Sequence, residues 1–164
     1  MDIFNLALAA FLSSAPAATE RPCAVGLIGT WQLVSISRQA PDGKRDDAPF
    51  GKHPSGMLIY TADGHTSVII SYDNRKRLSS DDRLAASTQE KATAFDTSFG
   101  YAGRYTCSEN RVVHHATMAS VPNWVGTDMV RIIRSANDKL TLSTPPLLVG
   151  GAASTWELTW ERSK

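Results

Sequence analysis

The sequence predicts an all-β protein: an eight-stranded antiparallel up-and-down barrel with one helical insertion. From Gly29 onward, short segments rich in β-branched and aromatic residues alternate with turn residues, which is typical of antiparallel strands. Nearly all of these segments are joined by short turns, which favours a barrel over a sandwich with crossover connections. Only residues 79–97 break the pattern, with a run rich in alanine, glutamine, glutamate and lysine that predicts a helix.

The first three strands follow from alternation and turn chemistry. Residues 29–38 alternate and end at a Pro-Asp-Gly turn over 41–43, where proline sets φ and glycine accepts a positive φ. Residues 42–54 are rich in Asp, Lys, Pro and Gly, so a long surface loop is expected there. The next two strands are predicted over 55–61 and 66–72, as a hairpin.

The rest of the chain supplies the helix and five strands. The serines and aspartates at 79–82 offer helix N-caps, and we expect the helix to lie outside the barrel or across its mouth. The five strands are predicted over residues 100–108, 111–120, 128–135, 139–143 and 153–162. In the last strand Trp156, Leu158 and Trp160 share one face, which indicates a half-buried strand.

Composition limits the classes of partner. The 164 residues fit one domain, and 42% hydrophobic with 20% charged residues is ordinary for a soluble globular protein. Seventeen Lys and Arg balance sixteen Asp and Glu, so no net field attracts nucleic acid, and we expect no nucleic-acid partner. No apolar segment is long enough for membrane insertion. Monomer and homodimer both stay open.

The N-terminal residues have the features of a targeting segment. Residues 1–22 are predicted to be a signal peptide or a disordered N-terminal segment, and 23–164 the barrel domain, because an apolar run at 6–12 precedes small residues at 15–18. Against export, Asp2 is acidic and no basic residue precedes the apolar run. A secreted or periplasmic location is favoured, with a cytoplasmic one as the alternative.

The chain has two cysteines, Cys23 and Cys107. In an exported chain they could form a disulfide, which would stabilise the fold by ~4 kcal/mol in the chain-entropy model. In a cytoplasmic chain they would be two unrelated buried thiols.

Several motifs together resemble one family. Residues 27–34, LIGTWQLV, contain the Gly-x-Trp opening of lipocalins, in which the tryptophan plugs the closed end of the barrel. The further motifs are GMLIYTADG at 56–64, NWVGTD at 123–128, LTLSTPP at 140–146 and LTW at 158–160. In this order they resemble the lipocalin-like domain family of small bacterial and fungal proteins. The resemblance runs from about Gly26 to the C-terminus.

The resemblance implies a barrel interior that holds a small, mostly apolar ligand. Some lipocalin-like proteins of biosynthetic pathways are cyclases or isomerases, so the resemblance also implies an enzyme as the alternative. The lipocalin motif carries a basic residue over the first-strand tryptophan, and Arg162 is the best positional match to pack on Trp31.

Strand parity nominates the residues of the interior, because every second residue of a barrel strand faces inward. Trp156 and Trp160 are expected inside. Tyr101 and Tyr105 share a face with Gly103, which would leave space beside them.

Two adjacent histidines must point to opposite sides of one strand, barring a bulge. One face holds Val113, His115, Thr117 and Ala119, and the other holds Val112, His114, Ala116 and Met118. We expect the face of His115 inside, because its polar members could meet a ligand. The apolar content of the other face argues for His114 instead.

An inward arginine would complete the site. Alternation over 130–134 places one of Arg131 and Arg134 near the interior, where its charge needs a carboxylate or a ligand oxygen. Trp124 either caps the open mouth or anchors a loop. The predicted ligand-binding residues are Tyr60, Tyr101, Tyr105, His115, Trp124, Arg131, Leu142 and Trp156.

The leading hypothesis is binding of a small, mostly apolar ligand inside the barrel. The alternative is a cofactor-free isomerase or cyclase for a hydrophobic biosynthetic intermediate, with His115, Tyr105 and Arg131 as catalytic residues that move a proton and stabilise an oxyanion. Equally, these side chains could form a purely structural network. No zinc-ligand spacing, phosphate loop or nucleophile elbow is present, so neither a metal nor a cofactor is expected.

Overall fold

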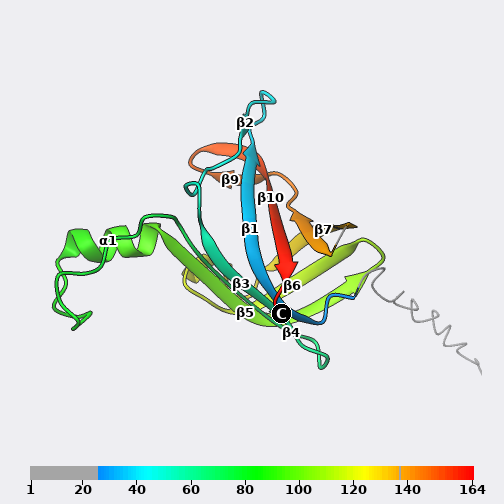
Figure 1. Ribbon diagram of the computed structural model, residues 1–164, viewed down its shortest axis with the longest axis horizontal. Helices are drawn as coiled ribbons and strands as arrows, with labels where there is room; N and C mark the ends of the chain where they lie inside the picture. The colour runs from blue at the N-terminus through cyan, green and yellow to red at the C-terminus, as the bar shows by residue number, and fades with distance from the viewer. Residues whose placement is uncertain (1–25, 137) are drawn as a thin grey trace, which may run out of the picture.

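The computed structural model describes residues 26–136 and 138–164, in which eight strands close into a barrel (Figure 1). These strands are β1 (Gly29–Gln39), β3 (Ser55–Tyr60), β4 (His65–Ser71), β5 (Ser98–Ser108), β6 (Arg111–Ala119), β7 (Asp128–Ala136), β8 (Lys139–Ser143) and β10 (Ala152–Arg162). Each strand pairs antiparallel with the next, and β1 pairs with β10 to close the sheet. The predicted eight-stranded up-and-down barrel with a helical insertion is therefore confirmed.

Two short strands lie where the sequence predicted only loops. β2 (Arg45–Asp46) pairs with the end of β1, and β9 (Leu147–Val149) pairs with the start of β10. β1 and β10 each have 11 residues, and each extends beyond its other barrel neighbour, so their free edges accept these additional strands.

The helix α1 (Thr88–Asp96) is shorter than the predicted 79–97. Its start is set by a capping box, in which the Ser87 hydroxyl accepts from the Glu90 amide and the Glu90 carboxylate accepts from the Ser87 amide. No helix in the described part of the chain has the length and apolar character needed to span a membrane. All residues of α1 lie outside the core, and the helix projects away from the barrel, so it does not cross the mouth (Figure 1).

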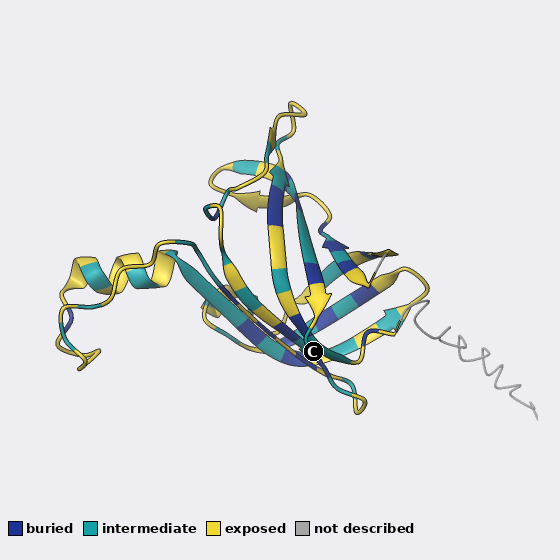
Figure 2. Ribbon diagram, in the orientation of Figure 1, coloured by how far each residue is buried: buried dark blue, intermediate teal, exposed yellow. Residues whose placement is uncertain are grey.

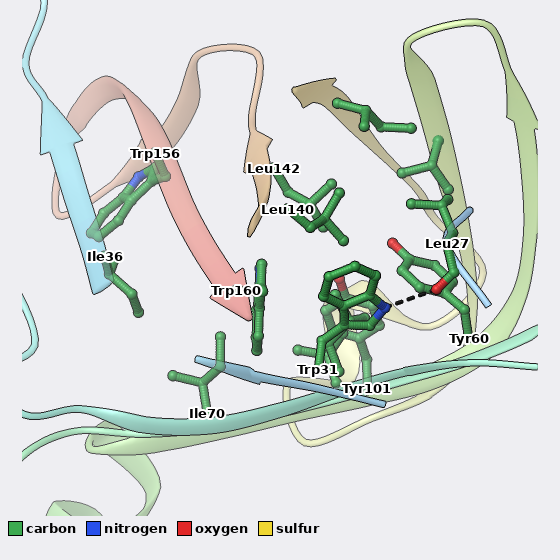
Figure 3. Close-up of a cluster of buried hydrophobic side chains, with 14 of the residues drawn as sticks. Leu27, Trp31, Ile36, Tyr60, Ile70, Tyr101, Leu140, Leu142, Trp156 and Trp160 are labelled. Atoms are coloured by element: carbon green, nitrogen blue, oxygen red, sulfur yellow. Dashed lines mark hydrogen bonds between the residues drawn. The ribbon is translucent and has the colours of Figure 1, made fainter. Parts of the chain in front are cut away.

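One end of the barrel is closed by the first-strand tryptophan. Trp31 is buried, and its indole nitrogen donates to the Leu27 carbonyl at 2.8 Å (Figure 3). The Arg162 guanidinium lies over the Trp31 ring at 4.3 Å and donates to the carbonyls of Ile28 and Gly26. The predicted packing of Arg162 on Trp31 is confirmed. The opposite end of the barrel, where Arg38 pairs with Trp156, is named the mouth.

The core lies inside the barrel, because alternate side chains point inward. On β4, for example, Thr66, Val68 and Ile70 are buried, whereas His65 and Ile69 are exposed (Figure 2). The buried apolar side chains that line the barrel include Trp31, Leu58, Tyr60, Val68, Ile70, Tyr101, Val112, Ile133, Leu140, Leu142, Trp156 and Trp160. The inward placement of both β10 tryptophans is thereby confirmed.

β6 places His114, not His115, in the interior. Over the regular part of the strand the buried residues are Val112, His114 and Ala116, of which Val112 and Ala116 belong to the apolar core. The expectation that His115 faces the interior is therefore wrong, because the apolar residues of the other face are the ones that fill the barrel. Beyond Ala116 the register between β5 and β6 shifts so that Gly103 pairs with Ala116 and Ala102 with Met118, and this bulge at Thr117 lets Ala119 pack against the core as well.

Gly103 serves this bulge rather than leaving space for a ligand. A Cβ at Gly103 would lie 1.9 Å from the His115 carbonyl oxygen and 3.0 Å from the Thr117 amide nitrogen. Two strand backbones approach closely here, and only glycine fits between them.

We predict that Gly103→Ala destabilises the fold by at least 1–3 kcal/mol, roughly the cost of overpacking a close contact. Urea unfolding measures this as a lower midpoint. The control is Gly26→Ala, where a Cβ would meet nothing within 4 Å. Equal midpoints for the two variants would contradict the role assigned to the bulge.

Candidate functional site

A polar cluster lies inside the otherwise apolar barrel. His114 of β6 stands between two tyrosines: its Nε2 is 2.6 Å from the Tyr60 hydroxyl, and its Nδ1 is 2.7 Å from the Tyr101 hydroxyl. All three side chains are buried, with His114 only 1% exposed. They come from β3, β6 and β5, so barrel closure brings them together.

Burial determines the protonation state of this cluster. Loss of solvent around the ring, assisted by the nearby positive charge of Arg131, lowers the pKa of His114 to about 3. Burial also raises the pKa of Tyr60 and of Tyr101. At neutral pH the imidazole is therefore neutral, with one nitrogen donating and the other accepting, and both tyrosines keep their protons.

Arg131 of β7 reaches the same cluster. It pairs in register with the fully buried Val112, and directly opposite residues share a face of the sheet, so its side chain points inward. Its Nη1 donates to the Val130 carbonyl at 2.8 Å, and its Nη2 lies 3.4 Å from the Tyr101 hydroxyl oxygen. Within the described residues no carboxylate forms an ion pair with Arg131.

Tyr105 lies beside this cluster but its hydroxyl is engaged elsewhere. Its ring meets the Tyr60 ring edge-on, with centroids 4.8 Å apart. Its hydroxyl donates to the Thr61 carbonyl at 3.0 Å. The catalytic role predicted for Tyr105 stays a prediction, and its hydroxyl already has an acceptor.

Aromatic rings line the mouth of the barrel. Phe50 stacks on Tyr72 with centroids 3.9 Å apart and lies 5.3 Å from the Trp156 ring and 5.8 Å from the Phe99 ring. Phe50, Tyr72 and Phe99 were not among the predicted site residues. Phe50 could have been suspected, because it is a lone aromatic residue inside a polar loop.

Trp124 connects the mouth to the polar cluster. It lies on the 3-10 helix η1 (Pro122–Trp124), half-buried, and its ring meets Phe99 at 5.6 Å and Tyr101 at 6.2 Å, both edge-on. Since Tyr101 in turn contacts His114, the ring contacts run without a break from the mouth to the buried histidine.

Some buried polar atoms on the inward faces find no hydrogen-bond partner among the described residues. They are the Thr66 hydroxyl, the Ser154 hydroxyl and the indole nitrogens of Trp156 and Trp160. Buried polar groups are normally hydrogen-bonded, so these groups indicate that the interior has donors available for the acceptor atoms of a ligand.

His115 lies on the outside of the barrel. Its Nδ1 is 2.6 Å from the Asp128 carboxylate and its Nε2 is 2.9 Å from the Thr106 hydroxyl, in an exposed network. It cannot contact an interior ligand from there, so His114 replaces it in the candidate site. Leu142 and Trp156, two of the predicted ligand-binding residues, are buried in the interior. Their contact with a ligand stays a prediction.

Two predictions concern residues that the structure does not describe. Cys23 and residues 1–22 lie outside the described residues, so the Cys23–Cys107 disulfide and the signal peptide stay predictions. Across residues 26–136 and 138–164 no group of three His, Cys, Asp or Glu side chains is placed to hold a metal ion.

We predict that His114 makes stability depend on pH. Because its pKa is about 3 in the fold and 6.5 when solvated, the unfolded chain binds a proton first as pH falls. The free energy of unfolding should therefore drop by about 1.4 kcal/mol per pH unit as the pH falls from about 6.5 to about 3, and this contribution should be fully present above pH 6.5. Urea unfolding at several pH values measures this.

His114→Gln should remove this part of the slope, whereas Tyr60→Phe should lower stability at every pH and keep the slope. An unchanged slope in His114→Gln would contradict the assigned protonation state.

Comparison with known proteins is consistent with this geometry. The model of the lipocalin-like domain family matches residues 28–163. The 4'-hydroxy-3'-methoxypropiophenone carrier protein ppsC of Aspergillus oryzae is 35% identical over 88 residues, which span 48% of this chain and 79% of that protein. The chain therefore belongs to the lipocalin-like domain family.

Proposed function

We propose that the protein is a carrier that binds a small aromatic ketone inside its barrel. The ring of the ligand would pack among the mouth aromatics, and its oxygen would accept hydrogen bonds from Tyr101 and Arg131. Membership of the lipocalin-like family and a relative named as a carrier support binding of a small molecule.

The observation that carries the proposal is the Tyr101–Arg131 pair. A guanidinium has five N–H donors, and among the described residues those of Arg131 have as acceptors the Val130 carbonyl, the Tyr101 hydroxyl and the Met129 sulfur. An inward cation with donors to spare favours a ligand with an acceptor oxygen.

The row of aromatic rings that links Phe50 to Tyr101 through Phe99 and Trp124 suggests which kind of molecule carries that oxygen. Aromatic pairs prefer edge-on and offset stacking, and the mouth presents several half-buried ring edges and faces. The ligand in the relative's name, an aryl ketone with hydroxyl and methoxy groups, has this combination of a flat ring and acceptor oxygens.

The low pKa of His114 favours a carrier over an isomerase or cyclase. A general base works best when its pKa lies near the operating pH, and the His114 value of about 3 is far below neutrality. The hydroxyl of Tyr105 is engaged with Thr61. Binding without turnover needs neither group to move a proton.

We predict that 4'-hydroxy-3'-methoxypropiophenone binds saturably and quenches the fluorescence of Trp124 and Trp156. Tyr101→Phe and Arg131→Gln should each weaken binding about tenfold or more, since a hydrogen bond from a charged group contributes about 1.5–3 kcal/mol. The control His115→Gln, on the outer face, should bind as the unmodified protein does.

The ligand should be recovered unchanged after long incubation, as chromatography would show. Absence of saturable binding would sink the proposal, and conversion of the ligand would replace carriage by catalysis.

A further inference from the structure

The charge of the interior cluster is not balanced by the described part of the protein. Of the ionisable side chains that meet in it, Tyr60 on β3, Tyr101 and Tyr105 on β5 and His114 on β6 are neutral at pH 7, and Arg131 on β7 is a cation. The inward residues of β4, β8 and β10 are apolar, hydroxyl or indole side chains. On β1 the inward Arg38 lies at the other end of the barrel, over the Trp156 ring, and its charge is paired with Asp46 at 3.8 Å. The cluster therefore carries one positive charge.

Acidic side chains on the strands and turns around the cluster have partners on the outer surface of the barrel. Asp128 faces His115, and Asp63 lies exposed with Thr61 and His65. Glu157 pairs with Arg134 on the outer surface of β7. None of these carboxylates is placed to balance Arg131.

The His114 cluster holds a second donor besides Arg131. A neutral imidazole accepts at one nitrogen only, so it can take the hydroxyl hydrogen of one of its two tyrosine partners and leaves the other hydroxyl hydrogen without an acceptor. When the ring proton is on Nδ1, Tyr60 donates to Nε2, and the Tyr101 oxygen accepts from the Nδ1–H and from Arg131. In that tautomer the hydroxyl hydrogen of Tyr101 can meet a ligand oxygen next to the guanidinium.

We propose that the barrel binds its ligand as an oxyanion, the phenolate of a phenol conjugated to the ketone, held by Arg131 and Tyr101. This inference rests on the proposed carrier function and goes further in naming the charge state. Burial acts on a bound phenol as it does on Tyr101, whose pKa it raises, and the charge of Arg131 acts against it. A ligand oxygen that accepts directly from the unpaired N–H donors of Arg131 forms a full ion pair with the guanidinium, so we expect the charge to prevail and the pKa of the bound phenol to fall by about 1–2 units. Below the pKa of the free phenol, binding releases the phenol proton to water.

The reporter is the ligand's own absorption, since a phenolate conjugated to a carbonyl absorbs at longer wavelength than the phenol. 4'-Hydroxypropiophenone is titrated from about pH 5 to about pH 9, free and with excess protein. Its methyl ether, 4'-methoxypropiophenone, cannot ionise and is the matched ligand. We expect the bound phenol to titrate at least about one pH unit lower than the free phenol, and the ether to bind about tenfold more weakly at pH 8.

Two variants separate charge from shape. Arg131→Gln should abolish the shift of the bound phenol and make phenol and ether bind alike, whereas Arg131→Lys keeps the charge and should keep most of the shift. Arg134→Gln, on the outer face of the same strand, should change neither. The comparison of phenol with ether on the unmodified protein needs no variant, so it stands even if an Arg131 variant unfolds.

The outcomes are distinct. A phenol that binds with the pKa of the free ligand, or an ether that binds equally well at pH 8, overturns the oxyanion proposal and leaves the carrier proposal standing. Failure of both ligands to bind overturns both proposals.

Discussion

The pairing of β1 with β10 is the interaction on which the rest of the structure depends. It joins the first and last strands of the barrel along eight register pairs from Trp31 to Gln39 and removes the open edges of the sheet. The same contact brings Arg162 over Trp31 and plugs one end. Without it the inward faces of the other strands would have no common interior.

Closure also explains how a histidine comes to be buried and neutral. Tyr60, Tyr101 and His114 lie on three different strands, and the closed sheet turns them toward one point away from water. Their hydrogen bonds satisfy the imidazole as a neutral group, so desolvation favours the uncharged ring. Arg131 then stands out as the cation of the cluster, and this contrast underlies both proposals about the ligand.

The strand order and the lipocalin-like resemblance could be predicted because they follow from local patterns. Alternating side chains, the Pro-Asp-Gly turn with Gly43 at a φ of 83° and the Gly-x-Trp motif each act within a few residues. Parity also predicted the inward faces of Trp156 and Trp160, and it left Arg131 and Arg134 as alternatives between which the strand register decided. The extra strands β2 and β9 could not be predicted, because they depend on free edges of distant strands.

What sequence patterning alone could establish is thus the barrel, its inward tryptophans and a polar interior with tyrosines and an arginine. Tertiary structure decided that His114, not His115, belongs to that interior. Parity left both faces of β6 open, and the buried face is that of Val112, His114 and Ala116, because Val112 and Ala116 pack against the side chains of other strands. The bulge at Thr117 then turns Ala119 inward too, through a shift of register between β5 and β6 that no single segment displays.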